Sequence, residues 1–164
     1  MELREMLLED YRKAVDVLFD LKSEQLISNC SMEHAAIINE MLFKYTPDKE
    51  SVYILCKNLH KDCFDNSQVL AAAKNAIERG ISIKIAYTDS QDADVFKSLS
   101  EKIIIKKVNP ILSSRTGKEL NFSTNGSAIR IEDDASTPQA DVIPSAPSIA
   151  QKIIALFNRL QETA

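Results

Sequence analysis

The feature that most constrains the fold is a strand–helix–strand pattern between residues 51 and 87. Residues 51–56 are rich in β-branched side chains and apolar on both alternating faces, which is typical of a strand covered on both sides. Small and aliphatic residues then recur at helical spacing from Val69 to Ile77, and Gly80 is a natural end for a helix. Isoleucines alternate with polar residues over 81–87. This βαβ unit predicts two parallel strands joined by a right-handed crossover.

Further periodic segments surround this unit. Apolar residues at three- and four-residue steps predict helices over residues 3–21, 31–45 and 90–100, and a terminal helix that opens near Pro147. We predict a strand over 102–108, a hairpin of strands 119–123 and 127–131 around Asn125-Gly126, and one more strand over 139–143. The predicted class is α/β, with a mixed, mainly parallel sheet flanked by helices. We expect one domain, with N-terminal helices over 1–46 and an α/β core over 50–160.

Composition excludes several classes of protein. The chain has 164 residues, of which 45% are hydrophobic and 27% charged, as in an ordinary soluble domain. Its net charge of −4 argues against a protein whose whole surface grips nucleic acid. The charged N-terminus resembles no signal peptide, and no apolar run reaches the ~20 residues that span a bilayer. We therefore expect no membrane association.

The cysteines indicate a reducing compartment. Cys30, Cys56 and Cys63 are odd in number and widely spaced, so a disulfide framework is not expected and a cytoplasmic location is. Cys56, His60 and Cys63 do not have a recognised zinc spacing, and buried free thiols are the simpler interpretation. We predict neither a metal nor a cofactor.

Two stretches resemble a half-domain of the phospholipase D family. Residues 52–56, 69–80 and 81–88 are similar to its opening unit, most clearly in Ala-Ile-Glu-Arg-Gly-Ile-Ser-Ile-Lys-Ile-Ala at 76–86. Residues 119–131, Glu-Leu-Asn-Phe-Ser-Thr-Asn-Gly-Ser-Ala-Ile-Arg-Ile, resemble the hairpin that carries the family's catalytic motif. The resemblance covers about residues 50–160. It implies a phospholipase D-like fold with added N-terminal helices.

The resemblance also implies that the catalytic motif is absent. That motif is His-x-Lys, four residues, then Asp; the histidine attacks phosphorus and the lysine binds phosphate oxygens. Alignment of the family's Asp-Gly with Asn125-Gly126 places Lys118 at the histidine position and Leu120 at the lysine position. Lysine is a poor nucleophile near neutral pH and leucine cannot bind phosphate. We therefore assign no catalytic residue.

Two groups of polar residues are candidate ligand-binding residues. Asn58, His60 and Asp62 follow the first strand of the βαβ unit, where open α/β sheets bind ligands. The alternative is a surface loop in which Asp65 or Asn66 caps the next helix.

Arg115 and Lys118, with Lys106 and Lys107, form a basic group that could hold phosphate, although a solvated sheet edge is the alternative. His34 is expected to be a buried structural residue. The run Glu132-Asp133-Asp134 is expected to be an acidic loop tip rather than a cation site.

These patterns predict a non-catalytic binding or regulatory module that acts through protein–protein contact. We expect a homodimer or a protein partner, with the apolar stripe of the first helix, including Leu3, Leu7, Leu18 and Phe19, in the contact. One alternative is a phosphodiesterase or nuclease-type enzyme that uses His60 and nearby acids. Another is a nucleic-acid-binding accessory protein that uses the basic group.

Overall fold

The computed structural model describes residues 3–57, 67–89, 103–137 and 139–162. Within these residues the helices are α1 (Leu8–Asp20), which follows a short 3-10 helix (Leu3–Glu5), α2 (Met32–Lys44), α3 (Ser67–Glu78) and α5 (Pro147–Asn158). The strands are β1 (Ile27–Asn29), β2 (Ser51–Cys56), β3 (Ser82–Tyr87), β4 (Ile104–Lys107), β5 (Asn121–Thr124), β6 (Ile129–Glu132) and β7 (Ala140–Ile143). The predicted helix over 90–100 lies outside the described residues.

All of these strands form one sheet in the order β1-β7-β6-β5-β2-β3-β4. The βαβ prediction is confirmed, because β2 and β3 are parallel with Ser51 opposite Ser82. The mixed α/β class is confirmed as well, although the sheet is less parallel than expected. Only the β2–β3 and β3–β4 pairs are parallel, since the hairpin strands, β7 and β1 all add antiparallel pairs.

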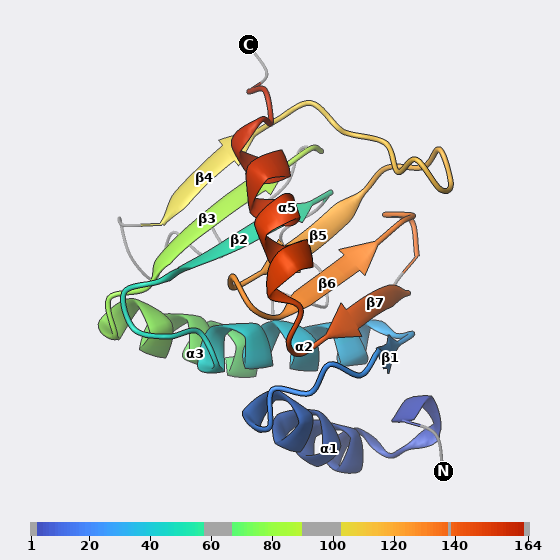
Figure 1. The fold of residues 1–164 in the computed structure, drawn as a ribbon, viewed down its shortest axis with the longest axis vertical. Coiled ribbons are helices and arrows are strands. Elements are labelled where there is room, and N and C mark those ends of the chain that lie inside the picture. Colours follow the sequence, from blue (N-terminus) through green and yellow to red (C-terminus); the bar gives the residue numbers. More distant parts are fainter. Residues whose placement is uncertain (1–2, 58–66, 90–102, 138, 163–164) are drawn as a thin grey trace.

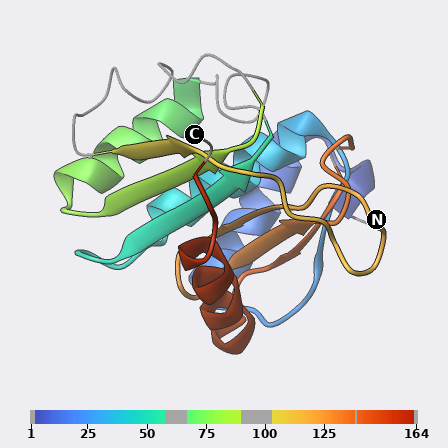
Figure 2. The ribbon, with the colours of Figure 1, turned by 90° about the horizontal axis from the view of Figure 1, so that it is seen from above.

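Helices cover the sheet on both faces. Figure 2 shows α2 and α3 on one side and α5 on the other. Val52, Ile54 and Ile83 pack among residues of α2 and α3, whereas Leu55 and Phe122 pack against Phe157 of α5. The alternation of strand residues between the two faces therefore accounts for both apolar layers.

Helix α1 lies outside α2 and is held there by its inner face (Figure 1). Tyr11, Val15 and Phe19 are buried in a cluster that includes Ile38 and Leu42 of α2. Phe19 is only 3% exposed, so our expectation that it contributes to a partner contact is wrong. Its side chain is already used to fix α1 to the rest of the chain.

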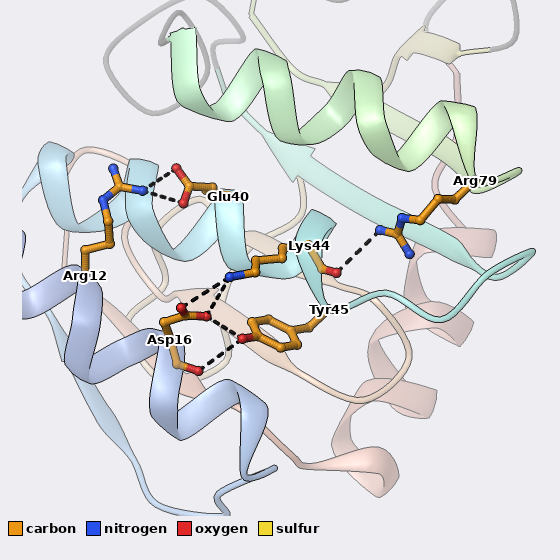
Figure 3. Close-up of polar contacts among 6 residues, drawn as sticks. All are labelled: Arg12, Asp16, Glu40, Lys44, Tyr45 and Arg79. Atoms are coloured by element: carbon orange, nitrogen blue, oxygen red, sulfur yellow. Dashed lines mark hydrogen bonds and ion pairs between the residues drawn. The ribbon is translucent and has the colours of Figure 1, made fainter.

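Polar contacts reinforce this attachment (Figure 3). Arg12 pairs with Glu40, and the Lys44 ammonium lies 3.0 Å from Asp16. Partial burial acts to raise the pKa of Asp16, but hydrogen bonds from Tyr45 and Lys44 hold that pKa below its usual value. Arg79 at the end of α3 donates to the Lys44 carbonyl oxygen at 3.4 Å, so three helices are tied together along α2.

Among the described residues, every helix is too short or too polar to span a bilayer.

Candidate functional site

The residues that the sequence alignment placed at the motif positions lie in the β5–β6 hairpin and just before it, and they do not converge. Asn125 is buried in the turn, where its Oδ1 accepts from the amides of Ser127 at 3.0 Å and Ala128 at 2.8 Å. Its Nδ2 donates to the Leu42 carbonyl at the end of α2, at 3.2 Å. Leu120 lies directly before the first residue of β5, whereas Asn125 follows its last residue. Asn125 therefore fastens the turn to α2 and takes no part in a site with Leu120.

Leu120 lies in a pocket between α5, the hairpin and the segment before it. This cavity of about 330 Å³, called the α5 pocket below, is lined mainly by apolar residues: Leu112, Leu120, Ile131, Ile149, Ile153 and Leu156. Leu112 is 66% exposed and Ile149 is 39% exposed. Leu120, which the sequence alignment placed at the family's lysine position, is thus part of an apolar surface. Lys118 is exposed and is not among the residues that line this pocket.

Charged residues at the α5 pocket fall into a paired group and an unpaired one. Arg115 lies 3.1 Å from Asp133 and 3.7 Å from Asp141, and Ser113 Oγ donates to Asp133 at 2.7 Å. Lys152 also lines the pocket, and it has no ion pair with any carboxylate of the described residues. Among the described residues that line the pocket, two cations, Arg115 and Lys152, outnumber the one carboxylate, Asp133.

A larger cavity of about 480 Å³ lies beside β1 and is lined by Cys30 and Arg115 among others. Cys30 Sγ is 3.8 Å from His34 Nδ1, and the Cys30 amide donates to the same nitrogen at 3.4 Å. The His34 ring stacks on Tyr11 with 3.8 Å between centroids. Burial lowers the pKa of His34, which favours the neutral imidazole. His34 therefore packs as a buried side chain, as its place on an apolar helix suggested.

A buried charged network on the α2 side of the sheet was missed by the sequence analysis. Arg130 and Glu132, both nearly inaccessible, form an ion pair along β6. Arg130 Nε donates to Asn29 Oδ1 at 2.8 Å, and Asn121 Nδ2 donates to Glu132 at 3.0 Å. The available signal was Arg-x-Glu at strand spacing, since Arg130 and Glu132 face the same side. Glu132 is thus part of the core rather than of an acidic loop tip.

The other predicted site residues have separate positions. Asn58, His60 and Asp62 lie outside the described residues. Lys106 and Lys107 are neighbours in β4 and so point to opposite faces, with the Lys106 ammonium 5.3 Å from the Phe157 ring centroid. The basic group proposed from the sequence is therefore divided. Within the described residues, no three histidine, cysteine or acidic side chains are grouped so that they could hold a metal ion.

Two chains illustrate what a comparison of the whole fold with solved structures finds. Nuc from Salmonella typhimurium, a phospholipase D family member, is 13% identical with a TM-score of 0.53; the match covers 85% of this chain and 97% of Nuc. The fold is therefore phospholipase D-like. The archaeal chromatin protein TrmBL2, described with a novel mode of DNA binding, is also 13% identical, with a TM-score of 0.54.

The match to TrmBL2 covers 92% of this chain and 61% of TrmBL2, so this chain corresponds to about three fifths of that protein. No protein-family model matches the sequence, and no curated protein is similar to it. The structural likeness confirms the phospholipase D-like fold that the hairpin and the βαβ unit implied.

Proposed function

We propose that the chain is a non-catalytic binding or regulatory module that acts through protein–protein contact. The observation that supports this most strongly is the arrangement of the three motif positions. Leu120 is in an apolar pocket, and Lys118 is exposed. The Asn125 side chain makes two hydrogen bonds within the turn and a third to the Leu42 carbonyl of α2. Nucleophilic attack on phosphorus needs a nucleophile and donors that converge on the phosphate oxygens. These three side chains supply neither.

The contact surface that we favour is the outer side of α1. Val17 of α1 is 56% exposed, and the residues that flank the helix, Leu7 and Leu21, are 77% and 71% exposed, although Tyr11 and Val15 of the helix are buried. With Ala14 they form the α1 outer stripe: Leu7, Ala14 and Leu21 recur every seven residues and Val17 lies three residues after Ala14. From Ala14 to Leu21 that spacing is typical of a helix–helix seam, and Leu7 lies just before the helix. A second copy would meet this stripe with the identical stripe, as in a symmetric dimer.

Light scattering after size-exclusion chromatography tests the contact. We expect the wild type to have twice the 18.3 kDa mass of one chain. Val17→Glu with Leu21→Glu should give the mass of one chain, because two buried charges in a helix seam are not tolerated. Ile104→Glu, at an exposed position of β4, is the matched control and should remain a dimer. A wild type that is monomeric at its highest soluble concentration would contradict the dimer.

A nucleic-acid-binding accessory protein is the second candidate. Strands β2, β3 and β4 contain three lysines and no carboxylate. The ammonium groups of Lys84 and Lys106 lie 5.1 Å and 5.3 Å from the ring centroids of Tyr53 and Phe157. The similarity to TrmBL2, whose DNA binding is described, adds to this candidate. An affinity for DNA that falls steeply with salt would favour it, and flat salt dependence would count against it.

A further inference from the structure

The α5 pocket has the composition of a small-ligand site. Its volume of about 330 Å³ is at the lower end of the range for such sites, which are mostly apolar with a few placed polar groups. Leu112 and Ile149 leave much of their apolar surface in contact with water at this pocket. An occupant with an aliphatic chain would remove that surface from water, and this removal is favourable.

The charge of the pocket selects an anionic occupant. Helix α5 contains Lys152 and no acidic residue. Of the charged residues that line the pocket, Arg115 is paired with Asp133, so Lys152 is the lining cation that has no ion pair among the described residues; Asp141, the second partner of Arg115, does not line the pocket. The first turn of α5 adds to this, because its N-cap residue Ala146 has no side-chain acceptor for the free amides. Free amides at a helix N-terminus and a lysine one turn later both favour a carboxylate nearby.

We propose that the α5 pocket binds a small amphipathic carboxylate, with its aliphatic chain against Leu120, Ile131 and Ile149 and its carboxylate at Lys152. A phosphate monoester fits less well, because Leu120 offers no donor and one unpaired lysine does not balance a doubly charged group. The pocket lies on the α5 face, whereas the α1 outer stripe lies beyond α2 on the opposite face. The inference therefore goes beyond the protein contact and stands independently of it.

Titration calorimetry with decanoate, below its micelle concentration at neutral pH, tests the proposal directly. Decanoate should bind with one site, and octanoate should bind about fifteenfold more weakly, because each buried CH₂ contributes about a factor of four. Decyltrimethylammonium, which has the same chain and the opposite charge, should bind far more weakly than decanoate. Equal affinity for the two head groups, or affinity that does not depend on chain length, would overturn the proposal.

Two variants separate the chain from the head group. Ile149→Asp should abolish decanoate binding, because it places a carboxylate where the aliphatic chain lies; its circular dichroism checks that it is folded. Lys152→Gln should weaken decanoate about tenfold and leave decanol unchanged, since only the charge-assisted contact is lost. Lys74→Gln, exposed on α3, is the control and should bind like the wild type.

The wild type and Ile149→Asp also distinguish a small ligand in the pocket from a second copy of the chain. If decanoate fails to bind and Ile149→Asp converts a dimer to a monomer, the pocket is an interface between copies and the proposal is wrong. If Ile149→Asp binds decanoate as the wild type does, the ligand lies elsewhere and the proposal is again wrong. Neither result alters the test of the α1 outer stripe, which uses Val17 and Leu21.

Discussion

Arg130→Met should lower the free energy of unfolding by about 3–5 kcal/mol, because it leaves the Glu132 carboxylate buried without its ion-pair partner. Arg130 is 4% exposed and Glu132 is 6% exposed. Arg130 also donates to Asn29, so the same change removes the side-chain contact from β6 to the edge strand β1. Urea unfolding followed by circular dichroism measures the loss.

Two further variants calibrate that result. Arg130→Met with Glu132→Leu should recover part of the lost stability, since the double change removes both charges rather than one. Lys44→Met breaks an exposed pair with Asp16 and should cost less than about 1 kcal/mol. If Arg130→Met lowers the free energy of unfolding no more than Lys44→Met does, the Arg130–Glu132 pair does not contribute to stability as a buried ion pair should.

Asn125→Ala should lower the free energy of unfolding by about 2–4 kcal/mol, because it removes two buried hydrogen bonds and one partly buried hydrogen bond at once. The Leu42 carbonyl and the amides of Ser127 and Ala128 would lose their partner. Urea unfolding is again the measurement. Asn158→Ala, at an exposed position in the last turn of α5, should change stability by less than about 0.5 kcal/mol.

Asn125→Asp separates a structural role from a catalytic remnant. The aspartate introduces the residue that the sequence alignment expects of the family here and keeps an oxygen for the two turn amides, but it loses the donor to Leu42. We expect a smaller loss of stability than for Asn125→Ala and no gain of phosphodiesterase activity. Asn125→Ala with wild-type stability would contradict the structural role of this residue.

The elements that local sequence patterns determine were predictable. The parallel unit was predictable from three local patterns: the alternation in β2 and β3, the helical spacing in α3, and the end of that helix at Gly80. Gly80 has a φ of +85°, which glycine adopts without strain. Asn125-Gly126 located the hairpin, and the fold class followed from the order of these elements.

The features that were not predictable depend on contacts distant in sequence. Strand β1 has only three residues, too few for a period, and its Asn29 contacts Arg130 on β6. Glu132 has acidic neighbours in sequence, and only its partner strand and Arg130 explain its burial. The α5 pocket joins Leu112 to Ile149, which no local pattern connects. The hypothesis for Asn58, His60 and Asp62 stays a prediction.

Hydrolysis of bis(p-nitrophenyl) phosphate by the purified chain tests the central claim most directly. We expect p-nitrophenolate to be released at the rate of buffer alone, and we expect Lys118→Ala and His60→Ala to leave this rate unchanged. Turnover above the buffer rate that either substitution abolishes would show a working phosphodiesterase site and contradict the account.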